Sequence, residues 1–152
     1  MQKSKLLIQA SLVTFFMLYG FLGYSGENTP SDTPEKNIAN YMKLLEKEPG
    51  SCFYTEQIAA NYQAINKFDQ AIQFYEQALD RCSDNLLNQF QLGICYYLTM
   101  DRNVGIEHMD KAIDQARKSG DKELEEMFRK EKEDWLKKWN MVKEMKWNRN
   151  KE

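Results

Sequence analysis

The feature that most constrains the fold of this chain is an internal repeat with a period of 34 residues. When the chain is laid over itself with that offset, residues 52–85 fall on residues 86–119, and the matched positions keep their size class. Small residues recur where two helices must approach closely, and large apolar residues recur where space between them must be filled. The matched pairs are Ile58 with Leu92, Ala59 with Gly93, Tyr62 with Tyr96, Ala71 with Gly105, Tyr75 with Met109, and Ala78 with Ala112.

Each copy of the repeat is predicted to be a pair of antiparallel helices. Helical periodicity breaks once in the first copy, at Asn66-Lys67, and once in the second copy, over residues 100–103. A single break between two periodic stretches is typical of two helices joined by a tight turn. The sequence therefore predicts an all-α fold.

The repeated positions resemble a known family. The segment Leu92-Gly93-Ile94-Cys95-Tyr96 resembles the Leu-Gly-x-x-Tyr signature in the first helix of tetratricopeptide (TPR) repeats, and Ala71, Tyr75 and Ala78 resemble the signature of the second helix. Pro49 stands where the proline that ends a preceding repeat would fall, so residues 34–51 are similar to the second helix of a degenerate unit. The resemblance covers roughly residues 35–119, and it implies a TPR-like solenoid of stacked hairpins.

Five positions depart from the family pattern, and two of them, Ser83 and Arg117, stand where Pro is common. Thr55 and Gln89 stand where Trp is usual, and Gly105 replaces Ala. Because glycine is about 1 kcal/mol less favourable than alanine inside a helix, Gly105 is expected to loosen its helix.

A long charged helix is predicted over residues 120–146, after a helix stop at Ser119-Gly120 and with Asp121 as its cap. It would cap the second repeat and bring the number of helices after the N-terminal segment to six. The alternative is that its distal part, with Trp139 and Trp147, overhangs the domain and binds a partner or a membrane surface. Residues 147–152 are predicted to be a tail. The apolar stripe of this helix comprises Leu124, Met127, Phe128, Trp135, Trp139, Val142 and Met145.

The N-terminus differs from the rest of the chain. Lys3 and Lys5 precede an uncharged run over residues 6–24. As a helix this run would span about 28 Å, close to the thickness of a bilayer's hydrocarbon core. Gly23-Tyr24-Ser25 supplies the small residues that a cleavage site requires. Residues 1–25 are therefore predicted to be a signal peptide or a retained membrane anchor, and both alternatives stay open.

Either alternative places the remaining chain on the non-cytoplasmic side of a membrane, because the basic residues stay in the cytoplasm. The protein is then exported, to a periplasmic or extracellular location, or is membrane-anchored through residues 6–24. Residues 26–33 are polar and predict a flexible linker. Pro34 suits the first position of a helix, with Thr33 as its N-cap, so the folded domain is expected to begin there.

The resemblance also implies a binding face, since in the family the first helices of the repeats line a concave groove. The second set of matching residues is strongly apolar, which favours a peptide or helix of another protein as partner. Two alternatives remain: the terminal helix covers this face, or the face makes a homo-oligomer. The matching positions are Phe53, Glu56, Ala60, Gln63 and Ala64 in the first copy, and Leu87, Phe90, Ile94, Tyr97 and Leu98 in the second.

The three cysteines fall into two groups. Cys52 opens the first helix of a hairpin and Cys82 closes the second, so antiparallel packing brings both to the same end. They either form a disulfide, as an oxidising compartment allows, or remain two unpaired thiols. Cys95 matches a small buried position and is interpreted as a core thiol.

Residues that carry chemistry are sparse. The sequence has no zinc-binding, nucleophile-elbow or phosphate-cradling motif, and its one histidine, His108, is interpreted as a partly exposed helix residue. The net charge of −2 gives no basic field for nucleic acid. We therefore expect a non-catalytic protein-protein interaction module without a cofactor or metal. The alternative is a structural protein that self-associates.

Overall fold

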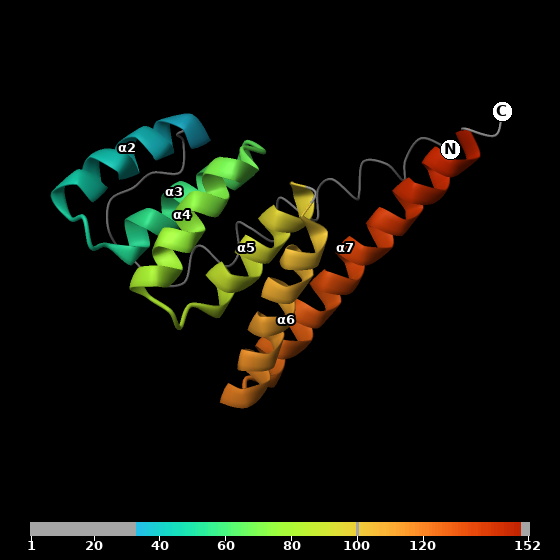
Figure 1. Cartoon of the computed structure of the whole chain (residues 1–152). Helices are drawn as coiled ribbons and strands as arrows, with labels where there is room; N and C mark the ends of the chain where they lie inside the picture. The colour runs from blue at the N-terminus through green and yellow to red at the C-terminus, as the bar shows by residue number, and fades with distance from the viewer. Residues whose placement is uncertain (1–32, 100, 150–152) are drawn as a thin grey trace. The chain divides into compact units, whose positions relative to one another are not determined.

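The computed structural model describes residues 33–99 and 101–149, with side chains described as far as residue 142. Within these ranges the chain forms six α-helices and no strand, which confirms the predicted all-α class (Figure 1). The predicted signal or anchor segment and nearly all of the predicted linker lie outside the described residues. Among the described helices, none combines the length and the apolar character that crossing a bilayer requires. The helices are α2 (Pro34–Lys47), α3 (Cys52–Ala64), α4 (Phe68–Arg81), α5 (Leu86–Leu98), α6 (Arg102–Ser119) and α7 (Lys122–Arg149).

The helix ends follow from local chemistry. Ser51 caps α3 by accepting a hydrogen bond from the backbone N–H of Tyr54 at 3.4 Å, and Asn85 caps α5 by accepting one from Asn88 at 3.0 Å. These two caps are one repeat apart. Asn66 breaks the first copy with a φ of 59°, a left-handed conformation that asparagine tolerates better than most residues.

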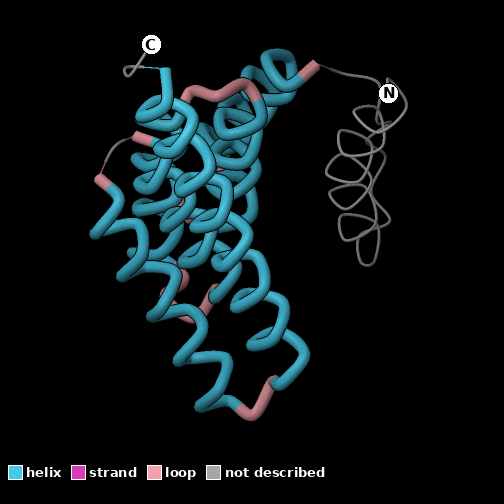
Figure 2. The backbone as a smooth tube through the Cα atoms, turned by 90° about the vertical axis from the view of Figure 1, so that its right-hand side faces the viewer, coloured by secondary structure: helices cyan, strands magenta, loops and turns pink. Residues whose placement is uncertain are grey.

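Each helix packs against the next helix in the chain, and the turns between them are short (Figure 2). The helices α3 and α4 form one hairpin and α5 and α6 form another. Helix α2 lies against α3, and α7 lies against α6. The arrangement is therefore local in sequence, as in arrays whose units contact only their neighbours.

Most of the residues matched by the repeat are buried. Of the twelve, ten are buried, and Tyr62 and Tyr96 are partly buried. One buried cluster joins the first hairpin to α5 and another joins α5 and α6 to α7. Helix α5 contributes to both clusters and has eight buried residues among its thirteen. A helix that is apolar on nearly every side is one with neighbours on nearly every side.

The closest packing occurs between α5 and α6, at the two glycines. A Cβ atom built on Gly93 would lie 2.7 Å from the carbonyl oxygen of Gly105, and one built on Gly105 would lie 2.6 Å from that of Gly93. The expectation that Gly105 loosens its helix considers the helix alone. In the hairpin, the missing side chain is what lets the two backbones meet.

The first and last helices of the array, α2 and α7, begin with different caps. Thr33 takes the N-cap position of α2 with an extended backbone, but its side chain makes no capping hydrogen bond. Gly120 ends α6 in the left-handed conformation with a φ of 79°, and Asp121 then accepts a hydrogen bond from the Leu124 N–H at 3.0 Å. Helix α7 continues to Arg149, past the predicted end at residue 146, because no glycine or proline follows Gly120.

Candidate protein-binding face

Three residues of the predicted groove are not available to a partner. Phe90, Ile94 and Tyr97 are only 0%, 2% and 4% exposed. Helix α7 covers them: the Phe128 ring stacks on Phe90 with centroids 4.4 Å apart, and Trp135 lies 6.4 Å from Tyr97. The assignment of these three residues to a partner-binding groove was wrong, because the terminal helix supplies the apolar cover that the sequence required. Leu98 is partly buried against the same cluster.

Two further groove residues connect the hairpins to each other. Gln63 donates to the Gln91 side-chain oxygen at 2.8 Å and accepts from the Tyr75 hydroxyl at 2.8 Å. Glu56 accepts from the Asn85 amide at 2.9 Å. The bonds to Gln91 and Asn85 cross from α3 to α5 and its cap, so they fix the register between the two repeats, whereas the bond from Tyr75 lies within the first hairpin. The alignment of the two copies did not predict these bonds, because the two residues of each bond do not stand at equivalent positions of the repeat.

The large apolar residues of the predicted groove that remain exposed lie in the first turns of α3 and α5. Phe53 is 49% exposed and Leu87 is 51% exposed, and they occupy the same repeat position. Two tyrosines surround Phe53, with ring centroids 6.2 Å away for Tyr41 and 5.7 Å away for Tyr54. We call Tyr41, Phe53, Tyr54 and Leu87 the aromatic end surface. The sequence predicted Phe53 and Leu87. Tyr41 was missed because it meets Phe53 only once α2 packs on α3, and Tyr54, the next residue of α3, was not among the predicted groove positions.

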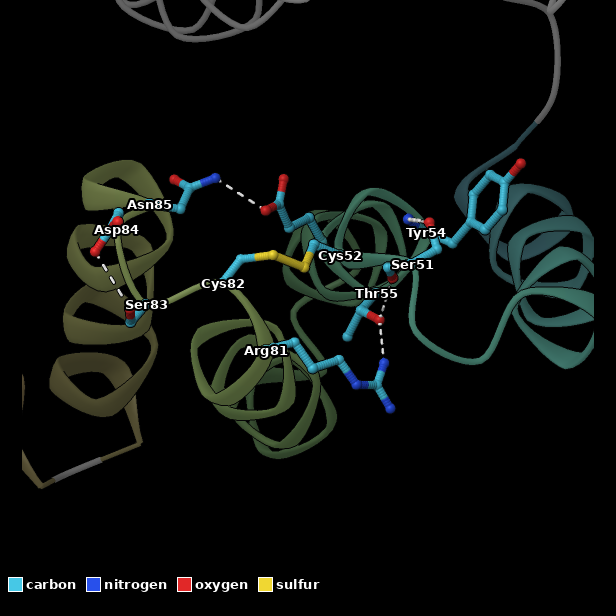
Figure 3. Close-up of a disulfide and its surroundings, with 10 residues drawn as sticks. Ser51, Cys52, Tyr54, Thr55, Arg81, Cys82, Ser83, Asp84 and Asn85 are labelled. Carbon is cyan, nitrogen blue, oxygen red and sulfur yellow. Dashed lines mark hydrogen bonds between the residues drawn. A yellow bond between two sulfur atoms is a disulfide. The ribbon is translucent and has the colours of Figure 1, made fainter.

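A disulfide lies at the same end of the molecule. Cys52, the first residue of α3, is bonded to Cys82, the C-cap of α4, with their Cα atoms 6.3 Å apart (Figure 3). This is the bridged alternative of the two that the sequence left open, and the Cα separation lies in the usual range. The bridge closes the open end of the hairpin opposite the turn at Asn66. It also holds the beginning of α3 near Asn85, and so holds Phe53 on the same end as Leu87.

A buried polar contact beside the disulfide explains one departure from the family pattern. Thr55 is fully buried, donates to the Ser51 carbonyl oxygen at 2.8 Å, and accepts a hydrogen bond from the Arg81 guanidinium at 2.8 Å. A tryptophan at this position would provide no acceptor for Arg81. The first hairpin thus has a polar and covalent closure where the family usually has an aromatic side chain.

Cys95 lies in the core, as expected. It is fully buried and carries a free thiol. Burial raises the pKa of the Cys95 thiol to about 12, so the thiol stays protonated at neutral pH.

His108 is half-buried on α6 and stacks on Tyr96 with ring centroids 5.4 Å apart. Its Nδ1 is hydrogen-bonded to the Gln89 side chain. Burial, assisted by nearby Lys111, lowers the pKa of His108, so the neutral imidazole is favoured. Gln89, the second departure from the family tryptophan, thus partners a histidine. Over the described part of the chain, no group of His, Cys, Asp and Glu side chains is arranged to hold a metal ion.

Known proteins give no direct guide to the function. No family model matches the chain, and no curated protein is significantly similar to it. The functional inference therefore rests on the residues of the aromatic end surface and on the repeat that places them.

Proposed function

We propose that this chain is a TPR-like scaffold, exported or membrane-tethered, that binds a segment of another protein on the aromatic end surface. The observation that carries the proposal is the exposure of Phe53 and Leu87 at one repeat position, while the other large apolar side chains described in the two repeats are buried or partly buried. Phe53, Leu87 and Met141 are the exposed large hydrophobic residues of the described chain. Two of the three therefore lie at the same end of the two hairpins, in the first turns of α3 and α5, and exposed apolar surface of this kind marks interaction sites.

The disulfide supports the proposed location. Disulfides persist in oxidising compartments and are rare where thiols are kept reduced. The bridge between Cys52 and Cys82 agrees with the Lys-flanked apolar run over residues 6–24, which favours export or anchoring.

The outer side of α2 has the polar character of a terminal helix, and it does not resemble a surface on which a further hairpin stacks. Ile38 faces α3 and is buried, whereas Glu35, Lys36, Asn40 and Lys43 are exposed. A polar outer side is what a terminal helix needs for solubility, and it gives no apolar surface on which another hairpin can stack.

The proposal is tested by crosslinking in the native membrane fraction with the tagged full-length chain. Phe53→Glu/Leu87→Glu places two charges on the aromatic end surface, and Gln73→Glu is the control, since Gln73 is also exposed but lies on α4, outside that surface. We expect the double variant to lose a crosslinked partner that the wild type and Gln73→Glu retain. Circular dichroism establishes that both variants stay helical. Equal recovery of the same partner with the double variant would overturn the proposal.

Light scattering distinguishes the structural alternative. If the aromatic end surface joins copies of this chain, the mass of the wild type rises with concentration and Phe53→Glu/Leu87→Glu abolishes the rise. A mass independent of concentration excludes self-association through this surface.

A further inference from the structure

Helix α7 extends beyond the ends of the helices that it packs against. Arg102, the first residue of α6, lies over the Trp139 ring at 3.2 Å from the centroid, so residues beyond 139 run past the beginning of α6. Tyr97, near the end of α5, donates to the Trp135 carbonyl oxygen at 3.4 Å, so α5 also ends at this level. Figure 1 shows α7 continuing beyond both neighbours. The ten residues from 140 to 149 add about 15 Å of helix.

The charge of α7 changes sign along its length. Residues 122–136, which lie along α6, contain four basic and six acidic residues. Residues 137–149, which we call distal α7, contain five basic residues and one acidic residue. The whole chain has a net charge of −2, so this short segment carries a local excess of positive charge on an otherwise acidic protein.

Distal α7 also contains apolar residues among its basic ones. Met141 is 54% exposed, and the sequence continues with Val142, Met145 and Trp147. Lys137 is 69% exposed one helical turn before Met141. Basic, aromatic and aliphatic residues mixed along one helix are typical of helices that lie in a membrane interface.

We propose that distal α7 binds the surface of an anionic lipid bilayer. An anionic bilayer is the partner whose charge complements this segment. Each basic residue near an anionic membrane surface contributes attraction, and Met and Trp side chains favour the interface. The proposed contact uses residues of neither the N-terminal segment nor the aromatic end surface.

Tryptophan fluorescence tests the proposal on the full-length chain. All three tryptophans of the chain, Trp135, Trp139 and Trp147, belong to α7, so their emission reports on this helix alone. The chain is reconstituted into vesicles of brominated phosphatidylcholine, with and without brominated phosphatidylglycerol. We expect stronger quenching with the anionic lipid, and we expect the difference to disappear at about 1 M salt, where the Debye length falls to about 3 Å.

Charge reversal provides the matched comparison. Lys143→Glu/Lys146→Glu/Arg149→Glu should lose the extra quenching with anionic lipid. Lys43→Glu/Lys67→Glu/Lys122→Glu changes the net charge equally, at exposed positions outside distal α7, and should keep the extra quenching.

Circular dichroism must show native helicity for both triple variants. Equal quenching with the two lipid compositions would overturn the proposal. So would a distal variant that is quenched like the wild type, and so would a protein crosslinked to distal α7 without any quenching. Because the aromatic end surface is untouched in these variants, loss of lipid binding leaves the partner proposal standing.

Discussion

The two hairpins share one pattern of small and large residues but are held together by different means. The first hairpin, α3 and α4, has Ala59 and Ala71 at its crossing and a disulfide across its open end. The second, α5 and α6, has Gly93 and Gly105 at the crossing and α7 over its outer face. The repeat determines the positions at which the two helices of each hairpin cross. The further interactions that hold the two helices together differ between the hairpins. The first hairpin is closed by a covalent bond, and the second by close approach and apolar cover.

The largest effect is expected where α7 covers the second hairpin. Phe128 and Phe90 are fully buried and their rings are nearly parallel, at 5°. Phe128→Ala should lower the free energy of unfolding by about 3–5 kcal/mol, because it removes a large buried side chain and leaves a cavity. Urea denaturation measures the loss. Met141→Ala, at an exposed position on the same helix, should change stability by less than about 0.5 kcal/mol; similar losses for both variants would show that α7 is not a cover.

The disulfide is the corresponding closure of the first hairpin. Cys52→Ser/Cys82→Ser opens a loop of 30 residues and should cost about 3–4 kcal/mol in the chain-entropy model. The same variant should leave the stacking of Phe90 on Phe128 intact, because those rings lie in the other hairpin. The measurement is urea denaturation with and without reductant. A reductant that destabilises the double variant as much as the wild type would contradict this role for the bridge.

A smaller effect on stability is expected at the positions where the two helices of each hairpin cross. Gly93→Ala should destabilise by about 1–3 kcal/mol through overpacking, although alanine is the better helix former, since the added Cβ would lie 2.8 Å from Met109 Cγ and 2.7 Å from a carbonyl oxygen. Ala59→Gly at the matched position of the first hairpin should cost only about 1 kcal/mol, the ordinary helix penalty. Thermal unfolding of both variants makes the comparison, and a stabilised Gly93→Ala protein would refute the close contact.

The smallest effect concerns pH at the second hairpin. Burial lowers the folded-state pKa of His108, so the unfolded chain binds this proton more readily. Stability contributed by the neutral imidazole is present above the ordinary pKa of 6.5 and is lost as the pH falls toward the folded-state pKa. His108→Gln should therefore reduce the loss of stability below pH 6.5. Urea midpoints at several pH values measure it, and an unchanged slope would exclude His108 as a contributor.

Much of the fold was predictable because its determinants are local. The break at Asn66, the stop at Gly120 and the cap at Asp121 each act within a turn or two of the chain. The size classes at matched positions, such as Ile58 with Leu92, required only an alignment of the chain with itself. These features produced six helices with nearly the observed ends.

The candidate site was less predictable because it depends on which apolar surfaces are covered by another helix. The sequence showed that Phe90, Ile94 and Tyr97 form an apolar surface, but only the position of α7 decides that this surface is internal. In the same way, helix propensity describes Gly105 correctly within α6 and misses its contact with Gly93, which lies on another helix. Tyr41 joined the exposed surface by a contact between helices that no periodicity reveals.

The most direct test of the account asks whether the second hairpin is a copy of the first. One period of 34 residues after Cys52 and Cys82 stand Leu86 and Ala116, which belong to one core cluster. If the two hairpins are equivalent, Leu86→Cys/Ala116→Cys should form a second disulfide on air oxidation, with Cys95 remaining free, as peptide mapping by mass spectrometry can show. Two free thiols at these positions in the folded, oxidised protein would contradict the repeat.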